Sequence, residues 1–346
     1  RSLMLLVGSY SEPGDSSLRA YRFDVATGNA EYIGAVPVAN ASYFTQSDSG
    51  ILYVVTESDS VQSALTAVRI DTESGVPEVL NTVTVGSAAP CYVAVSPDGR
   101  FAVTANYDGG TIAIFPISAG GSLGQRSELI HFDGFGPMSD RQDHSHPHCV
   151  AFTPDSLYML VDDLGTDRIH QFGLNPAGDS LVGSMPEQAV DILPGSGPRH
   201  IVFNEKGDMT YLINELSDSV TVLSYDNGTL VPVQYIAADT VGARGAADIH
   251  LSPDGRHLYA SLRLKHDGIA TFGVDPQTGL LSYVGHTDTL GHPRNFTLTP
   301  DGRFMLVASR DGNAVQLFSV DVRSGTLTDT GRSIPIPKPV CVKFVS

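Results

Sequence analysis

The chain has 346 residues, 41% of them hydrophobic, and a formal net charge of −17. This hydrophobic content excludes global disorder, and the acidic balance argues against nonspecific binding to nucleic acid or to an anionic membrane surface, because both need a basic protein surface. No apolar run approaches the roughly 18 residues of a membrane-spanning helix.

The predicted elements begin with three short strands, at residues 3–10, 18–24 and 31–38. After them the chain repeats one pattern six times: an apolar strand, a polar turn and a second apolar strand. These six hairpins are predicted at residues 43–57, 92–106, 149–163, 200–215, 249–261 and 296–309. In three of them the turn contains Pro-Asp-Gly, which favours a tight turn because Pro presets φ and Gly tolerates a positive φ.

A further alternating strand that ends in a turn follows each hairpin. Counting the copy near the N-terminus there are seven such strands, at residues 18–24, 65–71, 111–118, 168–175, 219–226, 268–275 and 314–321. Equivalent positions in successive copies lie 46 to 57 residues apart, and short strands at such a period are typical of a β-propeller. We therefore predict an all-β, seven-bladed β-propeller with four antiparallel strands per blade, formed as one domain by residues 1–346.

The two ends of the chain fit a closed ring. The chain begins with strands that resemble the second, third and fourth strands of a blade, so the first blade lacks its inner strand. The segment at residues 340–344 resembles an isolated inner strand. We expect this C-terminal strand to complete the N-terminal blade.

Propeller geometry predicts which loops share a face. The loops that enter the inner strands and the loops between the second and third strands surround one mouth of the central channel, a common place for binding sites. Aligning the repeats places several basic, acidic and amide side chains around this mouth. They are His146, His148, Asp163, Arg199, His200, Glu215, Arg263, His292, Arg294 and Asn295. Because Arg suits bidentate contacts with carboxylate or phosphate, we predict an anion-binding mouth.

A metal ion is the alternative for the histidine-rich part of this mouth. His144, His146 and His148 could ligate a divalent metal together with Asp143 or Asp163. Histidines in adjacent loops are also good donors to anions, so we predict neither a metal ion nor another cofactor. The sequence contains no Walker loop, Cys-x-x-Cys pair or His-Glu-x-x-His pair.

Several stretches on this mouth carry a family resemblance. They are His146-Pro-His-Cys-Val-Ala-Phe-Thr-Pro-Asp155, Asp163-Leu-Gly-Thr-Asp-Arg168, Gly197-Pro-Arg-His-Ile-Val-Phe203, Asn214-Glu-Leu216, Ser252-Pro-Asp-Gly255 and His292-Pro-Arg-Asn-Phe296. Over essentially the whole chain the sequence resembles the seven-bladed propeller lactonases, which include bacterial 6-phosphogluconolactonases and the fungal carboxy-cis,cis-muconate cyclase. The resemblance implies an active-site set that falls on His148, Arg199, Glu215 and Arg263. Two positions depart from the family pattern, Leu262 and Arg310.

The resemblance implies hydrolysis of a sugar lactone, with 6-phosphogluconolactone as the expected substrate and 6-phosphogluconate as the product. Lactone opening needs an activated water and stabilisation of the carbonyl oxygen as it becomes negative. We expect Glu215, or else His148, to be the general base, and Arg199 and Arg263 to stabilise the oxyanion. Substrate binding is expected from His146, Asp163, His200, His292, Arg294 and Asn295.

Three other functions use the same residues. The chain could cyclise an unsaturated diacid such as carboxymuconate, it could be a non-catalytic propeller that binds an anionic metabolite or a protein, or it could be a metal-dependent lactonase. In the main hypothesis the partner is a small anionic lactone, with neither nucleic acid nor membrane; the sequence predicts no oligomeric state.

The cysteines bear on the cellular compartment. Cys91, Cys149 and Cys341 are odd in number and far apart, which favours buried thiols over a disulfide framework. Together with the pathway that the resemblance implies, they favour the cytoplasm. The sequence begins with Arg1 rather than Met, so an exported form remains an alternative.

Overall fold

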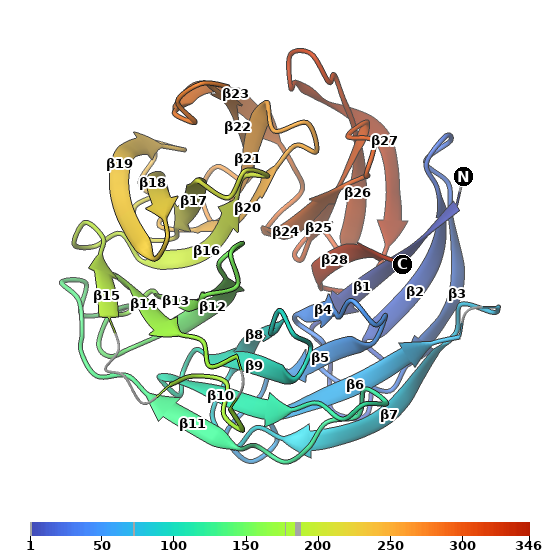
Figure 1. Cartoon of the computed structure of the whole chain (residues 1–346). Coiled ribbons are helices and arrows are strands. Elements are labelled where there is room, and N and C mark those ends of the chain that lie inside the picture. Colours follow the sequence, from blue (N-terminus) through green and yellow to red (C-terminus); the bar gives the residue numbers. More distant parts are fainter. Residues whose placement is uncertain (1, 72, 177, 184–187) are drawn as a thin grey trace.

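A computed structural model describes residues 2–71, 73–176, 178–183 and 188–346 of the chain. All 28 regular elements in these ranges are β-strands, and this part of the chain holds no helix that could span a membrane. The strands form seven four-stranded antiparallel sheets arranged as the blades of a ring (Figure 1). The prediction of a seven-bladed β-propeller is confirmed.

The strands of each blade follow one another outward from the channel. Those of the first blade are β28 (Pro339–Val345), β1 (Ser2–Ser9), β2 (Leu18–Asp24) and β3 (Ala30–Val36). Those of the second and third blades are β4 (Phe44–Gln46), β5 (Leu52–Thr56), β6 (Ala64–Ile70), β7 (Pro77–Thr84), β8 (Pro90–Val95), β9 (Phe101–Asn106), β10 (Thr111–Pro116) and β11 (Glu128–His131).

The remaining four blades follow the same order. Those of the fourth and fifth blades are β12 (Pro147–Phe152), β13 (Tyr158–Asp163), β14 (Arg168–Gly173), β15 (Gln188–Asp191), β16 (Pro198–Phe203), β17 (Met209–Asn214), β18 (Ser219–Asp226) and β19 (Thr229–Ala237). Those of the sixth and seventh blades are β20 (Ala246–Leu251), β21 (His257–Leu262), β22 (Gly268–Val274), β23 (Leu281–Asp288), β24 (Pro293–Leu298), β25 (Phe304–Ser309), β26 (Ala314–Val320) and β27 (Leu327–Pro335).

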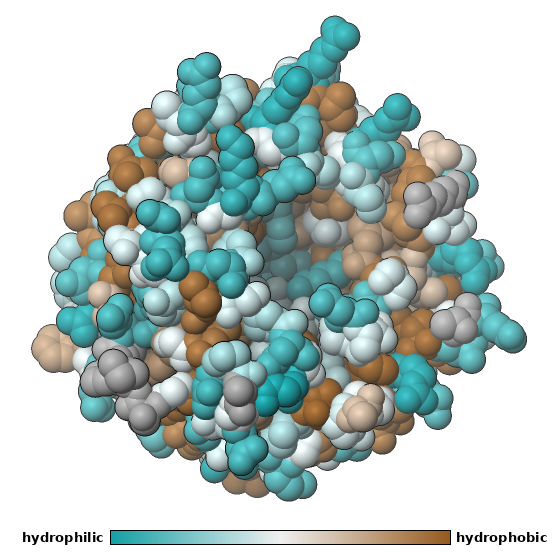
Figure 2. All heavy atoms as spheres, viewed as in Figure 1, coloured by the Kyte–Doolittle hydropathy of each residue, from teal (hydrophilic) through white to brown (hydrophobic). Residues whose placement is uncertain are grey.

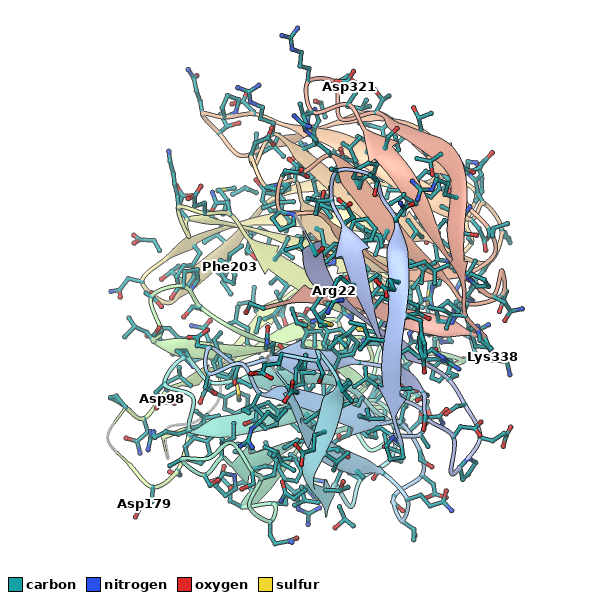
Figure 3. The ribbon with its side chains drawn as sticks, turned by 90° about the vertical axis from the view of Figure 1, so that its right-hand side faces the viewer. Arg22, Asp98, Asp179, Phe203, Asp321 and Lys338 are labelled. Atoms are coloured by element: carbon teal, nitrogen blue, oxygen red, sulfur yellow. The ribbon has the colours of Figure 1, made fainter. Side chains whose placement is uncertain are left out.

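The turn between the two inner strands of a blade follows from its sequence. In the third blade Gly99 takes a φ of 74° and its amide donates to the Ser96 carbonyl, a conformation that glycine adopts without steric cost. The Asp98 carboxylate accepts from the Arg100 amide and the Ser96 hydroxyl, which holds the turn together. In side view, Asp98 and Lys338, which precedes β28, lie on opposite sides of the ring (Figure 3). The turns and the strand-entry loops therefore occupy different faces, as predicted.

The C-terminal strand closes the ring. β28 pairs antiparallel with β1, from Met4 opposite Val345 to Ser9 opposite Pro339. The next blade also holds it, because the Val342 amide donates to the side-chain oxygen of Asn295 at 2.8 Å. The prediction that the C-terminus completes the N-terminal blade is confirmed.

Neighbouring blades are joined by apolar packing and by a repeated tyrosine contact. The second strand of a blade is buried on both faces, as the fully buried β9 illustrates. Neighbouring blades pack on one another through these faces. The hydroxyls of Tyr53, Tyr211 and Tyr259 each donate to a carbonyl in the outer turn of the following blade, at 2.7 Å. The cysteines are buried free thiols, as predicted. A central hollow lined by hydrophilic residues remains in the ring (Figure 2).

Candidate active site

A β-bulge at the start of the inner strands aims side chains at the mouth of the channel. In the fourth blade Pro147 faces Asp163 and Cys149 faces Asp162, which leaves His148 between them without a partner in the ladder. The same register shift leaves out Arg199 in β16 and Arg294 in β24. A bulge turns a side chain away from the alternation of the strand. His148, Arg199 and Arg294, which are equivalent positions in the sequence repeats, are therefore all bulged positions.

These side chains border a cavity of about 350 Å³ at the mouth. Its lining residues are Glu57, Ala89, Cys91, Tyr107, Asp108, Arg141, His148, Glu215, Arg263, Leu264 and Arg294. The volume lies within the range of pockets that hold small ligands. Of the residues selected from the sequence, the structure brings His148, Glu215, Arg263 and Arg294 to the cavity wall.

Glu215 lies at the centre of an arginine cluster. Its Oε1 accepts from Arg199 Nε at 2.9 Å and from Arg263 Nη2 at 3.1 Å. Its Oε2 accepts a short hydrogen bond from Arg141 Nη2. Burial by itself raises the pKa of Glu215, but the three guanidinium groups lower it more strongly, to about 2. The carboxylate is thus ionised at neutral pH and is a weak proton acceptor.

Arg199 lies behind Glu215 and outside the described cavity wall. The residue is 1% exposed, and besides Glu215 its guanidinium donates to the Ala247 carbonyl at 2.7 Å. Burial lowers the pKa of Arg199, and so does Arg294, while Glu215 opposes the change. A buried guanidinium of this kind needs a partner that carries the opposite charge. Its contacts therefore make Arg199 an anchor of Glu215.

His148 is an uncharged side chain of the cavity wall. Burial lowers the pKa of His148 well below 6.5, and the nearby Arg199 and His200 lower it further. Its Nδ1 is buried and has no hydrogen-bond partner among the described residues. A neutral imidazole can accept a proton at neutral pH. Its lowered pKa also makes it a weak base, but both oxygens of Glu215 are taken up by guanidinium groups and the ring nitrogens of His148 are not, so His148 is the better candidate for a base.

Two arginines of the cavity wall are held in place by neighbouring groups. Arg294 lies 3.6 Å from the Glu57 carboxylate and stacks over the Tyr10 ring, with 5.4 Å from its Cζ atom to the ring centre. Arg263 donates to the Gly245 carbonyl at 2.8 Å and lies 3.3 Å from His292 Nε2. Burial lowers the pKa of Arg263 to about 9, so the group remains charged at neutral pH.

Sequence reasoning missed Arg141 and Tyr107 as site residues. Arg141 belongs to the loop between β11 and β12, and its side chain is 33% exposed. It donates to the Tyr107 hydroxyl at 3.1 Å as well as to Glu215. The available signal was the length of this loop, which makes the repeat the longest in the chain, at 57 residues.

Several residues selected from the sequence lie beside the cavity, where other groups of the protein engage their polar atoms. Both ring nitrogens of His146 have partners, the Tyr107 carbonyl at 2.8 Å and the Asp143 carboxylate at 2.9 Å. Asp163 accepts hydrogen bonds from the His146 amide, the Ser145 hydroxyl and His170. These contacts give His146 and Asp163 a role in shaping the loop before β12.

His200 and Asn295 are likewise engaged by another residue of the protein, Asp248. His200 Nδ1 lies 2.9 Å from Asp248 Oδ1, and Asn295 donates to the other oxygen of that carboxylate at 2.8 Å. Burial and the neighbouring Arg199 lower the pKa of His200 to about 4, so the imidazole is neutral at pH 7. His292 contacts Arg263 at the edge of the site, and burial and Arg263 lower its pKa to about 2.

The two departures from the family pattern lie outside the described cavity wall. Leu262 is buried in the apolar core between two blades. Arg310 pairs with the neighbouring Asp311 at 2.9 Å and borders a separate hollow beside Tyr10 and Lys338. A leucine at position 262 therefore contributes to packing rather than to the polar wall of the mouth.

Comparison with known proteins agrees with the seven-bladed fold. A family model described as "Lactonase, 7-bladed beta-propeller" matches residues 4–344. A 6-phosphogluconolactonase from Bacillus subtilis is 33% identical over 349 residues, which covers 98% of this chain and 97% of the relative. A crystal structure of a candidate 6-phosphogluconolactonase from Bacteroides fragilis is 45% identical with a TM-score of 0.96, covering 100% and 98% of the two chains. The periplasmic gluconolactonase of Pseudomonas aeruginosa is 32% identical with a TM-score of 0.93, covering 100% and 99%.

Proposed function

The chain belongs to the seven-bladed β-propeller lactonases, and from this premise we propose that it hydrolyses 6-phosphogluconolactone to 6-phosphogluconate. The observation that carries the proposal is the cavity wall, which holds Arg141, Arg263 and Arg294 beside the carboxylates of Glu57, Asp108 and Glu215, in a protein whose net charge is −17. Guanidinium groups gathered at one small cavity suit an anionic substrate.

The proposed reaction begins with His148 as the general base. Its neutral imidazole takes a proton from a water molecule as the oxygen of that water attacks the lactone carbonyl carbon. The bond between this carbon and the ring oxygen then breaks, and the proton passes from His148 to the departing ring oxygen. Addition of one water to the ring ester gives the open hydroxy acid, so atoms and protons balance.

Arg263 is proposed to stabilise the carbonyl oxygen as it becomes negative. It lines the cavity, and a charged donor held in place before the reaction stabilises developing charge without reorganisation. Its second amino group donates to Glu215, which fixes the guanidinium. In this proposal Glu215 is a positioning residue: it acts through Arg263, Arg199 and Arg141. His148 therefore replaces Glu215 as the preferred base.

Arg294 is proposed to hold the phosphate. Its guanidinium is kept in place by Glu57 and the Tyr10 ring, and it faces the same cavity as His148 and Arg263. His146 and His200, considered for this task from the sequence, have other partners. A sugar phosphate is too polar to cross a bilayer unaided, so this substrate supports a cytoplasmic location, although the Pseudomonas aeruginosa relative is named periplasmic.

A rate comparison on phosphorylated and unphosphorylated gluconolactone tests the proposal. After subtraction of spontaneous hydrolysis, wild-type enzyme should show the higher kcat/KM on the phosphorylated lactone. Arg294→Met should raise KM for that lactone at least about tenfold, which corresponds to about 1.4 kcal/mol of binding, and should leave the unphosphorylated lactone nearly unaffected. Arg310→Met is the matched control, because Arg310 lies outside the cavity, and should change neither.

The alternative substrate is the unphosphorylated lactone, as the name of the Pseudomonas aeruginosa relative suggests. Equal kcat/KM on both lactones in the wild type, or an equal loss on both in Arg294→Met, would favour it. Activity on carboxymuconate without activity on either lactone would favour the cyclase.

A further inference from the structure

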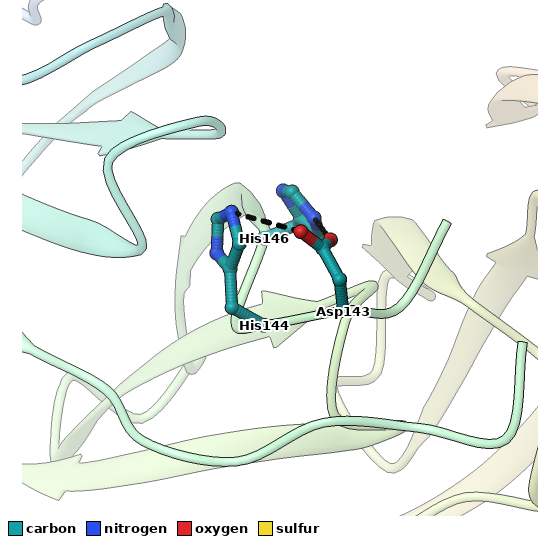
Figure 4. A group of neighbouring side chains, drawn as sticks. All are labelled: Asp143, His144 and His146. Carbon is teal, nitrogen blue, oxygen red and sulfur yellow. Dashed lines mark hydrogen bonds and ion pairs between the residues drawn. The ribbon is translucent and has the colours of Figure 1, made fainter. Parts of the chain in front are cut away.

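Three side chains on the loop before β12 converge outside the cavity. Asp143 Oδ1 lies 2.9 Å from His146 Nε2, and Asp143 Oδ2 lies 3.8 Å from His144 Nε2. One ligand atom from each of these residues lies within 4.8 Å of the others. Both imidazole rings approach the same carboxylate (Figure 4). The group therefore has the composition of a three-ligand metal site: two imidazole nitrogens and one carboxylate.

Hydrogen bonds on the far side of each ring determine which nitrogen is turned toward Asp143. His146 Nδ1 lies 2.8 Å from the Tyr107 carbonyl, and His144 Nδ1 lies 2.7 Å from the Ser145 carbonyl. A carbonyl oxygen only accepts, so in each neutral ring Nδ1 carries the hydrogen and Nε2 carries the lone pair. Histidines that bind metals commonly donate their other nitrogen to a carbonyl in this way.

Each Nε2 thus faces a carboxylate oxygen, and at His146 the two atoms are joined by a hydrogen bond of 2.9 Å whose proton a metal ion would replace. A cation between the nitrogen and the oxygen satisfies both. Ligands about 2.0–2.1 Å from one zinc ion in a tetrahedral site lie about 3.3 Å from each other. The observed distances of 2.9 and 3.8 Å lie on either side of this value.

We propose that Asp143, His144 and His146 bind a divalent first-row transition-metal ion of the Zn²⁺ type. Two nitrogen ligands favour such an ion over Mg²⁺ or Ca²⁺, which prefer oxygen. The side chains of His144 and Asp143 are 46% and 58% exposed, so the ion can enter from solvent and keep a water ligand.

The site lies beside the reaction, separated from the cavity by Tyr107. The described lining of the cavity does not include its three ligands. Tyr107 stacks on His146 with ring centres 4.4 Å apart, and its hydroxyl accepts from Arg141. Because all three ligands belong to the loop that carries Arg141, a bound ion would stiffen that loop. The proposed lactone hydrolysis does not pass through it.

A second cluster, formed by Asp239, His266 and His286, is a weaker candidate. Its two rings are stacked 3.6 Å apart at an angle of only 12°. Lone pairs lie in the plane of each ring, so those of parallel stacked rings run alongside one another. The rings of His144 and His146 are tilted by 38°, which allows their lone pairs to meet.

Calorimetric titration of the chelator-treated full chain with Zn²⁺ tests the proposal. Wild type should bind one ion, and Mg²⁺ should not compete. His144→Ala should weaken zinc binding at least about tenfold. Loss of a residue that merely supports a metal ligand already weakens binding about 10–100-fold, and loss of a direct ligand should cost no less. Since His144 is largely exposed, its loss should leave the fold intact. Asp143→Asn, an independent exposed change, should weaken binding similarly.

Two histidine variants serve as matched controls, His131→Ala on the exposed edge of β11 and His266→Ala in the second cluster. Both should bind zinc like wild type. Absence of zinc binding in wild type would overturn the proposal and leave a shared proton between Asp143 and His146. Binding that His266→Ala weakens and His144→Ala leaves unchanged would overturn it too, and would assign the ion to the second cluster.

Discussion

Replacing Glu215 by glutamine separates the two roles considered for this residue. Three arginines bring the pKa of the buried carboxylate down from 4.5 to about 2. At 1.36 kcal/mol per unit, this lowering corresponds to about 3 kcal/mol in favour of the ionised form. Glu215 is 4% exposed, so solvent screens little of this energy. Glutamine has the same shape without the charge, and Glu215→Gln should lower the free energy of unfolding at pH 7 by about 3 kcal/mol.

Urea unfolding followed by far-UV circular dichroism measures this change; the chain has no Trp to serve as a fluorescent probe. The matched control is Glu57→Gln, the same substitution in the same cavity. Glu57 makes one long ion pair with Arg294 and accepts from the Ser42 hydroxyl at 3.1 Å. Its loss should cost less than the loss of Glu215, because it removes one long ion pair rather than three close ones.

Kinetics on the phosphorylated lactone complete the test. A positioning role predicts that Glu215→Gln raises KM, because Arg141 loses its partner, while kcat falls by less than about tenfold, because the Gly245 carbonyl still holds Arg263. A general base predicts the opposite pair of results: a kcat loss of about 10²–10⁴ with unchanged stability. That second outcome would refute the assignment of Glu215 as a positioning residue.

Three other changes have defined outcomes. His148→Gln should lower kcat about 10²–10⁴-fold in the lactone assay with an unchanged urea midpoint; full activity would exclude His148 as the base. Burial and Arg199 lower the pKa of His200 from 6.5 to about 4, so its contribution to stability is complete above pH 6.5 and is lost as the pH falls to about 4. Urea unfolding at pH 7, 5.5 and 4 should show a loss of up to about 3 kcal/mol from this group, smaller in His200→Gln; identical pH curves would argue against it. Tyr259→Phe removes the donor to the Gly325 carbonyl and should cost about 1 kcal/mol in the same measurement; an unchanged midpoint would mean that water replaces the contact.

The ring was predictable because its determinants are local. Strand alternation and the Pro-Asp-Gly turns repeat along the chain, and each repeat specifies one blade without reference to distant residues. The alignment of these repeats also placed His148 and Arg294 correctly at the mouth of the channel. The bulge that directs these side chains comes from pairing between strands, which a repeat alignment does not describe.

The sequence predicted His148, Glu215, Arg263 and Arg294 at the cavity but could not predict the rest of its wall, nor which of the other selected residues lie outside it. Arg141 lies in an irregular loop with no counterpart in the other repeats, so no register fixes its position. His200 and Asn295 occupy the expected backbone positions, but Asp248 of another blade engages both. Arg199 is held by Glu215 in the same way. These contacts arise only when blades meet around the channel, and they decide which polar groups remain for a substrate.

The position of β28 has a consequence for synthesis on the ribosome. Residues 339–345 emerge after every other strand of the ring, so until then β1 presents an unpaired edge to the surrounding solution. An unpaired edge is a template for pairing with another chain. Nascent chains stalled before this point should therefore be prone to aggregate and to depend on chaperones, and a second copy that supplied its own last strand would produce a swapped dimer.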